Sequence, residues 1–235
     1  MSNAFSPLHA TFRFVADLLA PEDCFVCGAA SGGSALCAAC EAELPRLCAA
    51  CPVCATPTLQ GEICGHCLSA PPAFDATHAA FEYAFPVDKM VQALKYRYRL
   101  SLVPLFVRAL EDFGPFADGA VVLPMPLHVQ RLRERGFNQA VEIARPLARR
   151  WGLPLELARV ARVRDVTPQA RLPLHARHDN IKGVFVCDGR LDGRTVVVVD
   201  DVMTTGATLE TLAAVLKRHG ASRVVNVVVA RTPPP

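Results

Sequence analysis

Two adjacent carboxylates, Asp200 and Asp201, follow a run of four valines in the stretch VVVVDDVMTTGATLETL, residues 196–212. Such a run is typical of a strand buried on both faces of a parallel sheet, and ligands of these sheets bind beyond the carboxyl ends of the strands. Two carboxylates at that place can accept hydrogen bonds from adjacent hydroxyls of a polyol. The pair therefore predicts a site for a ligand that carries a diol.

The turn after the aspartates has the composition of an anion site. It leads into a helix, so that free backbone amides, threonine hydroxyls and a glycine that permits close approach meet at one place. The residues of this turn are Thr204, Thr205, Gly206, Ala207 and Thr208. A phosphate cradle beside a diol site predicts a ribose 5-phosphate as the ligand.

Other interpretations of the aspartates fit less well. A magnesium-binding aspartate of a nucleotide hydrolase requires a G-x-x-x-x-G-K-[ST] loop, and the sequence contains no Gly-Lys dipeptide. A dinucleotide site requires G-x-G-x-x-G after a strand, and no predicted strand is followed by one. A purely structural acidic loop would leave the TTGAT that follows unexplained.

The cysteines form a second group with a chemical pattern. Nine of the ten lie between Cys24 and Cys67, and the spacing C-x2-C, nine residues, C-x2-C occurs twice. In a reducing compartment such pairs favour metal over disulfides, and four thiolates make a closed tetrahedral site for structural zinc. The predicted ligands are Cys24, Cys27, Cys37, Cys40, Cys51, Cys54, Cys64 and Cys67.

The sequence does not determine which C-x2-C pairs combine around each zinc ion. Sequential pairing gives two stacked ribbons, cross-brace pairing interleaves them, and the number of structural zinc ions is one or two. Cys48 offers a second register within CAACPVC, and His66 could replace a neighbouring ligand. The region is acidic and has one aromatic residue, Phe25, between its first and last ligands. We therefore interpret it as a metal-stapled structural domain rather than a nucleic-acid binder, although it could dock a partner.

The elements that must position the aspartates indicate an α/β domain with a parallel sheet. Helices are expected at Asn138–Arg150, with a kink at Pro146, and between Gly206 and Gly220. The strand–turn–helix–strand unit at the end of the chain predicts a right-handed parallel crossover. The expected strands are Ala120–Leu123, Val184–Val186, Thr195–Val199 and Val224–Ala230.

The sequence divides after the clustered cysteines, at Pro71 and Pro72. We expect an N-terminal helix in residues 1–20, the double zinc ribbon in 21–70 and the α/β domain in 73–235. No apolar run approaches the roughly 20 residues of a membrane span, and the N-terminus lacks the regions of a signal peptide, so we expect a cytoplasmic protein. Between Arg131 and Arg177 eleven arginines face four acids, which predicts an anionic partner for the second domain.

The motifs together resemble a known family. Val196–Thr208 resembles the phosphoribosyl pyrophosphate (PRPP) signature of type I phosphoribosyltransferases, and the cysteine pairs resemble an N-terminal double zinc ribbon. Nearly the whole chain resembles the competence protein F (ComF) family. The other stretches that carry this resemblance are LKY at 94–96, LPMPLH at 123–128, RLRERGFNQA at 131–140, and TPQARLPLHARHDNIKGVF at 167–185, with Arg177 and Asn180.

The resemblance implies roles for particular residues. Asp200 and Asp201 would bind the ribose hydroxyls, and Thr204–Thr208 would bind the 5-phosphate. Pro124–Leu127, which includes Met125, would lie beside a pyrophosphate that carries magnesium, and residues 167–182 would close over the site. The candidate cations that would help pyrophosphate depart are Arg131, Arg133, Arg135 and Lys95.

The implied function is PRPP binding and phosphoribosyl transfer to an unidentified acceptor, in natural competence, where internalised single-stranded DNA is handled. The implied partners are PRPP, single-stranded DNA and a competence helicase. One alternative is a non-catalytic nucleic-acid-binding module regulated by PRPP, and another is a nucleobase-salvage phosphoribosyltransferase.

Several of these residues also have a structural interpretation. The arginines of 131–135 could form a solvated helix face, and Lys95 could be a surface charge. Asn138 and Gln139 could cap the helix that follows them, His128 could have a structural role, and Cys187 is expected in the core.

Overall fold

The computed structural model describes residues 23–164 and 183–233. The expected N-terminal helix of residues 1–20 lies outside these ranges, as does the expected closing loop of residues 167–182 with Arg177 and Asn180. All the predicted zinc ligands and the whole stretch 196–212 lie within them.

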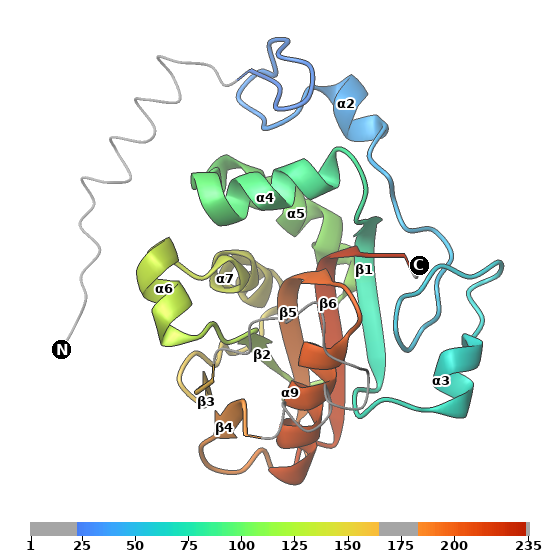
Figure 1. Cartoon of the computed structure of the whole chain (residues 1–235), viewed down its shortest axis with the longest axis vertical. Coiled ribbons are helices and arrows are strands. Elements are labelled where there is room, and N and C mark those ends of the chain that lie inside the picture. The colour runs from blue at the N-terminus through green and yellow to red at the C-terminus, as the bar shows by residue number, and fades with distance from the viewer. Residues whose placement is uncertain (1–22, 165–182, 234–235) are drawn as a thin grey trace, which may run out of the picture.

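A parallel four-stranded sheet forms the centre of the molecule, in the order β1 (Ala76–Glu82), β6 (Arg223–Arg231), β5 (Thr195–Met203) and β2 (Val121–Pro124) (Figure 1). The valine run lies in β5, which pairs with a parallel strand on each side. The predicted α/β class with a parallel sheet is therefore confirmed.

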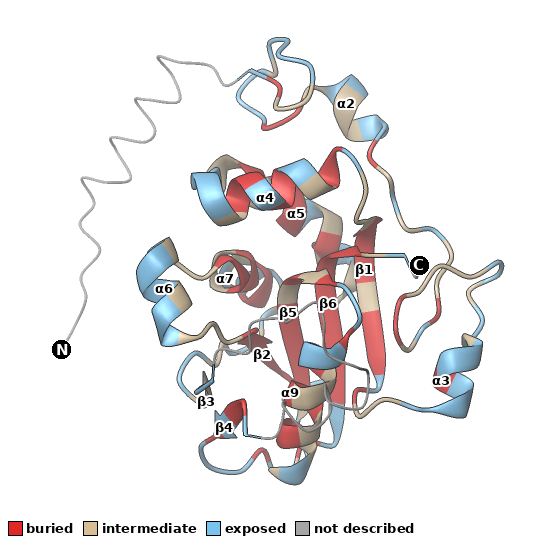
Figure 2. Cartoon of the chain, viewed as in Figure 1, coloured by how far each residue is buried: buried red, intermediate tan, exposed pale blue. Residues whose placement is uncertain are grey.

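Helices cover both faces of this sheet. Val197 and Val199 pack in one apolar cluster with α4 (Val87–Arg97), α5 (Val103–Leu110) and α7 (Gln139–Trp151). Val196 and Val198, which point to the other face, pack with α9 (Ala207–Arg218). Because successive residues of a strand point to opposite faces, burial on both sides requires the continuous apolar run that the sequence contains. Figure 2 shows the strands buried along most of their length.

β5 is longer than predicted. The expected end at Val199 is wrong, because the ladder with β6 continues through Asp200 opposite Val228 to Met203 opposite Arg231. Both aspartates thus lie within the paired part of β5, near its carboxyl end, rather than in a loop after it. The other regular elements are α2 (Ala38–Ala42), α3 (Gly65–Ser69), η1 (Leu100–Leu102), η2 (Glu111–Phe113), α6 (Val129–Arg135), and the antiparallel pair β3 (Val160–Arg162) and β4 (Phe185–Cys187).

The predicted helix at 138–150 is α7, which continues through Pro146 as one helix. Asn138 is its N-cap, as one interpretation of the sequence proposed: its side-chain oxygen accepts from the backbone N–H of Ala140 at 2.9 Å. His128 caps α6 through its Nδ1, which accepts from the N–H of Gln130 at 3.3 Å. Cys187 is buried in the core, as expected.

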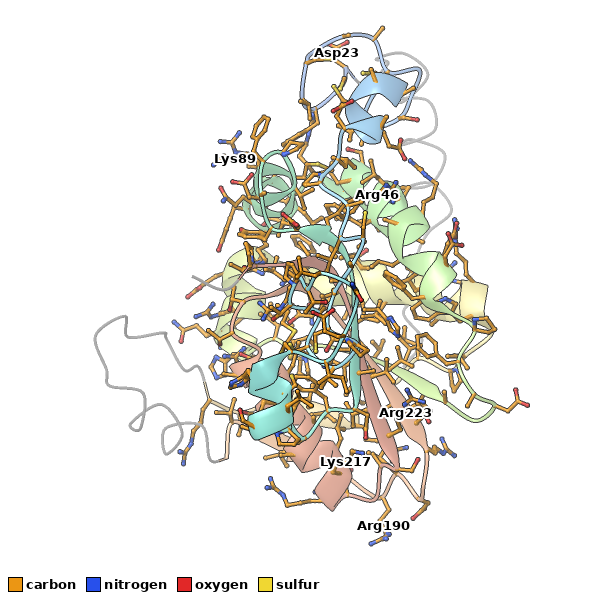
Figure 3. The ribbon with its side chains drawn as sticks, turned by 90° about the vertical axis from the view of Figure 1, so that its right-hand side faces the viewer. Asp23, Arg46, Lys89, Arg190, Lys217 and Arg223 are labelled. Carbon is orange, nitrogen blue, oxygen red and sulfur yellow. The ribbon has the colours of Figure 1, made fainter. Side chains whose placement is uncertain are left out.

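The segment between the two cysteine groups runs along the free edge of β1. Leu47 N–H donates to the Ala80 carbonyl at 3.0 Å, and Glu82 N–H donates to the Pro45 carbonyl at 2.8 Å. This segment contains Arg46, which Figure 3 labels. The Arg46 guanidinium lies 5.5 Å from the ring centroid of Phe81. The segment covers backbone groups that an exposed edge strand would offer to another chain.

The two cysteine groups join different sides of the core. Cys24, Leu36 and Leu44 belong to the cluster with α4 and α5, whereas Cys51 and Cys54 belong to the cluster with α9. Figure 1 shows the first group above α4 and α5 and the second beside β1. Within the described residues, no helix has the length and apolar character needed to cross a membrane.

Candidate functional site

A pocket of about 310 Å³ lies at the carboxyl ends of β2 and β5. Residues from six parts of the chain line it, and they include all seven of the predicted diol and phosphate residues. The lining residues are Lys95, Tyr96, Met125, Pro126, Leu127, Arg131, Arg135, Asn138, Gln139, Arg162 and the continuous stretch 200–209. Parallel strands bring their carboxyl ends to one edge of the sheet, which explains why these segments meet.

Two of the candidates for the pyrophosphate side are not among the described residues that line this pocket: Pro124 and Arg133. Pro124 is the buried last residue of β2 and lines a separate hollow. Arg131 and Arg135 are four residues apart on α6 and share a face, whereas Arg133 lies two residues from each and is exposed elsewhere.

One of the two carboxylates forms an ion pair with a lysine. Asp201 is 3% exposed, and its Oδ2 lies 2.9 Å from Nζ of Lys95, which comes from α4. Asp200 is partly buried, and its Oδ1 accepts from the backbone N–H of Asp201 at 2.8 Å. Lys95 is thus engaged with Asp201 rather than lying on the surface.

These contacts shift the acidity of two groups. Burial, together with the negative charge of Asp201, raises the pKa of Asp200 to about 7, although Lys95 acts in the opposite direction. Burial acts to lower the pKa of Lys95, but the attraction of Asp201 outweighs it and raises that pKa. The site therefore holds the Lys95 ammonium beside Asp201 and, in Asp200, a carboxyl group that gains or loses its proton near neutral pH.

The turn after β5 has the backbone geometry of an anion cradle. Gly206 is the N-cap of α9 with a φ of +83°, and a Cβ at this position would lie 2.6 Å from Cε of Met203. Thr204, Thr205 and Thr208 are exposed in the pocket. The first-turn N–H groups of α9, a twelve-residue helix, have no acceptor within the helix and carry its positive dipole end. A phosphate bound here would accept hydrogen bonds from amides and hydroxyls together.

Arg135 is held in place on the opposite wall. Its Nη1 donates to Oε1 of the buried Gln139 at 2.6 Å, and its guanidinium lies 5.3 Å from the ring centroid of Tyr96. Arg131 lines the same wall. Beside the pocket, a second hollow of about 380 Å³ is lined by Lys95, Tyr96, Tyr98, Arg131, Glu134 and Arg135.

Sequence reasoning missed three features of this pocket. Tyr96 was identified only as part of LKY, and Arg162 comes from β3, a three-residue strand without a usable periodicity. Asn138 has a second role besides its cap, because its Nδ2 donates to the Met125 carbonyl at 3.0 Å and so ties the loop after β2 to α7.

The cysteines form two groups of four with sequential pairing, and within each group all ligand atoms lie within 4.8 Å of one another. The groups are Cys24, Cys27, Cys37 and Cys40, and Cys51, Cys54, Cys64 and Cys67.

Both groups fit a tetrahedral zinc ion. With Zn–S bonds of about 2.3 Å, neighbouring sulfurs should be about 3.8 Å apart, and the structure has 3.8 Å between Cys27 and Cys37 and 3.6 Å between Cys54 and Cys64. Neither Cys48 nor His66 belongs to either described group, and Cys48 is exposed. The arrangement indicates two closed, structural zinc sites.

Comparisons with known proteins give the same two parts. Residues 137–234 match the family model of the phosphoribosyl transferase domain, and residues 15–68 match that of the double zinc ribbon domain. The DNA utilization protein YhgH of Escherichia coli (strain K12) is 30% identical over 217 residues, which cover 88% of this chain and 96% of that protein.

Competence protein F of Haemophilus influenzae is 29% identical over 171 residues, which cover 68% of this chain and 75% of that protein. Among solved structures, the purine phosphoribosyltransferase from Pyrococcus horikoshii is 18% identical with a TM-score of 0.34, over 58% of this chain and 85% of that one. A TM-score this low supports no further argument.

Proposed function

Because the chain belongs to the family of competence protein F and DNA utilization protein YhgH, with a phosphoribosyltransferase domain and a double zinc ribbon, we propose that it binds PRPP with magnesium and acts in the use of DNA taken up by the cell. The observation that carries the PRPP proposal is the pocket at the ends of β2 and β5. It combines two carboxylates, a phosphate cradle and three arginines in one space.

Each part of the ligand has a counterpart in this pocket. Asp200 and Asp201 accept hydrogen bonds from the ribose hydroxyls, and the amides and hydroxyls of Thr204–Thr208 hold the 5-phosphate. Met125, Arg131 and Arg135 lie on the side that faces the pyrophosphate. Lys95 balances the charge of Asp201, so that the pocket can accept an anionic ligand without two adjacent unbalanced carboxylates.

The proposed chemistry is displacement of pyrophosphate from the ribose by an acceptor that remains unidentified. Negative charge grows on the departing pyrophosphate, and fixed cations beside it stabilise that charge. Magnesium bound with the ligand would supply further positive charge to the leaving group. The contribution of this chain is to hold the sugar by its hydroxyls and its phosphate while Arg131 and Arg135 face the leaving group.

A ligand series tests the proposed site. Calorimetric titrations compare PRPP, ribose 5-phosphate, 2-deoxyribose 5-phosphate and inorganic phosphate, each with magnesium. We expect affinity to fall in that order, with roughly tenfold lost between the two sugar phosphates, because the deoxy sugar lacks a hydroxyl that donates to a carboxylate. Equal affinity for the two sugar phosphates would contradict recognition of the diol by Asp200 and Asp201.

A second candidate function, a PRPP-regulated module that binds single-stranded DNA without catalysis, is favoured by the hollow beside the pocket. Tyr96 and Tyr98 are 68% and 57% exposed there, next to Arg131 and Arg135. Exposed aromatic rings beside arginines suit stacked bases and a phosphate backbone. A nucleobase-salvage role predicts instead that some free base plus PRPP yields a nucleotide, and a negative panel of bases would exclude it.

The DNA proposal has its own test. Affinity for a single-stranded oligonucleotide should fall steeply with salt, should fall several-fold in Tyr96→Ala and should survive Asp201→Asn. Phe85→Ala is the matched control, because Phe85 is 69% exposed but does not line the hollow. Salt-insensitive binding, or an equal loss in Phe85→Ala, would argue against it.

A further inference from the structure

Arg231, the last residue of β6, is a charged side chain that is only 7% exposed. It lies outside the pocket lining, and the proposed chemistry does not use it. Burying a guanidinium is costly unless its N–H groups find acceptors. Besides the carbonyl of the adjacent Thr232, the acceptors come from two segments far apart in the sequence, so one side chain connects both segments.

The first segment is the turn of the second zinc ribbon. Arg231 Nε donates to the Cys54 carbonyl at 2.9 Å, and its Nη2 donates to Oγ1 of Thr56 at 3.1 Å. The turn is closed by two backbone hydrogen bonds, Ala55 N–H to the Cys51 carbonyl and Cys51 N–H to the Thr56 carbonyl, both at 2.8 Å. In Figure 1 the C-terminal end of β6 lies beside this ribbon.

Thr56 connects this contact to the metal site. Its Oγ1 lies 3.2 Å from Sγ of Cys54, one of the four ligands of the second group. When Cys54 is a zinc-bound thiolate, the threonine hydroxyl donates to the sulfur and its oxygen still accepts from Arg231. Thiolate, hydroxyl and guanidinium then form one continuous series of hydrogen bonds.

The second segment is the start of the phosphate cradle. Arg231 Nη1 donates to the carbonyls of Met203, at 3.3 Å, and of Thr204. In a planar trans peptide the N–H points opposite to the C=O, so a Thr204 carbonyl held on Arg231 directs the N–H of Thr205 away from Arg231. That orientation leaves the N–H for a ligand oxygen, and Thr205 lines the pocket.

The first ribbon packs elsewhere. Its Cys24, Leu36 and Leu44 join the core with α4 and α5, and Arg108 of α5 donates to Glu41 of α2 at 3.2 Å. The two zinc sites, although alike in sequence, should therefore differ in what depends on them.

We propose that Arg231 is a positioning residue through which the second zinc ribbon holds residues 203–205 in the conformation that binds the ligand's phosphate. Loss of metal from the second cysteine group, but not from the first, then weakens PRPP binding. This inference rests on the proposed PRPP site, and its regulatory consequence is that zinc loss from the second ribbon lowers ligand affinity.

The test uses the full chain, one variant of the link and one of each ribbon. Arg231→Met keeps the volume but removes the donors, and Arg231→Lys keeps the charge and some of them. Cys51→Ser and Cys24→Ser each remove a buried ligand, one from each group. Thr77→Val is the stability control, because it removes the buried hydrogen bond of 3.1 Å from Asn226 but keeps the backbone N–H of Thr77, which donates to the Pro52 carbonyl of the second ribbon at 3.1 Å.

Two readouts are needed: the Kd for PRPP with magnesium, and amide hydrogen exchange at residues 203–208 without ligand. We expect Arg231→Met and Cys51→Ser each to raise the Kd and the exchange rate at residues 203–208 about tenfold. Arg231→Lys should show smaller increases in both quantities. Cys24→Ser and Thr77→Val should lower Tm but leave Kd within about twofold and exchange unchanged.

The inference is overturned if the exchange rate at residues 203–208 in Arg231→Met is the same as in Thr77→Val, since Arg231→Met keeps all four zinc-binding thiols of the second group and does not depend on the folding of the Cys51→Ser ribbon. If the wild type binds no PRPP, the proposed function fails while the exchange experiment still decides on the link.

Discussion

The ion pair of Lys95 and Asp201 makes a quantitative prediction for Lys95→Met. The variant leaves Asp201, 3% exposed and next to Asp200, without its cation. At 2.9 Å and an effective dielectric constant of about 20, the attraction is about 6 kcal/mol before desolvation. Removing one partner of a buried pair typically costs about 3–5 kcal/mol. Because the Lys95 side chain is 21% exposed, we expect the free energy of unfolding to decrease by the lower end of this range, about 3 kcal/mol at pH 8.

The loss should depend on pH with a definite sign. Without the ammonium, one of the two carboxyl groups keeps its proton in the folded protein up to a higher pH than in the unfolded chain. The folded state then binds more protons than the unfolded state. The free energy of unfolding of the variant therefore falls as pH rises from the pKa of that group in the unfolded chain to its higher pKa in the folded protein. The deficit relative to the wild type should therefore be smaller at pH 5.5 than at pH 8.

Urea unfolding followed by the fluorescence of Trp151, the single tryptophan, measures this. Trp151 ends α7, and its Nε1 donates to the Glu111 carbonyl at 2.8 Å, so it reports on the sheet domain. The double variant Lys95→Met/Asp201→Asn should recover most of the loss, because it removes the stranded charge. Equal deficits at both pH values, or a double variant no more stable than Lys95→Met, would refute the reasoning.

Three further predictions concern single features. Gly206→Ala should lower the free energy of unfolding in urea by about 1–3 kcal/mol, because the residue has a φ of +83° and its new Cβ would clash with Met203. Gly136→Ala, with a φ of +75° but a nearest contact of 3.5 Å, should lower it less. The reverse order of the two losses would contradict this prediction. Burial raises the pKa of Asp200 to about 7, so the folded protein binds a proton that the unfolded chain releases near pH 4, and stability falls between these values. Asp200→Asn removes that fall and should gain about 2 kcal/mol relative to the wild type between pH 5 and pH 8; a pH-independent difference in urea unfolding would contradict the shift. A chromogenic chelator added to the denatured protein should count two zinc ions per chain, one for each cysteine group, whereas a count of one would contradict sequential pairing.

The local patterns in the sequence predicted much of the fold and of the site. Four successive valines require burial on both faces, and the repeated cysteine spacing requires closed metal sites. Both interpretations depend on neighbouring residues only. The segments that converge on the pocket around Asp200 and Asp201 could be anticipated because parallel strands share one ligand-binding edge.

What the sequence did not predict depends on contacts between distant segments. Aspartates are depleted in strands, so Asp200 and Asp201 indicated the end of β5, and only the pairing with β6 carries the strand to Met203. Arg231 belongs to no motif, and its partners Cys54 and Thr204 lie 177 and 27 residues away. The helicase partner, the cytoplasmic location and the domain limits at residues 20, 70 and 73 stay predictions.

The central claim is that Asp200 and Asp201 hold the ribose of PRPP. Calorimetric titration of PRPP with magnesium into the wild type, Asp201→Asn and Asp75→Asn tests it most directly. Asp75 is the control, since it precedes β1 at the opposite end of the sheet and pairs at 2.7 Å with Lys217, which Figure 3 labels. We predict saturable binding in the wild type and in Asp75→Asn, and affinity at least about tenfold weaker in Asp201→Asn. Undiminished binding by Asp201→Asn, or none by the wild type, would contradict the claim.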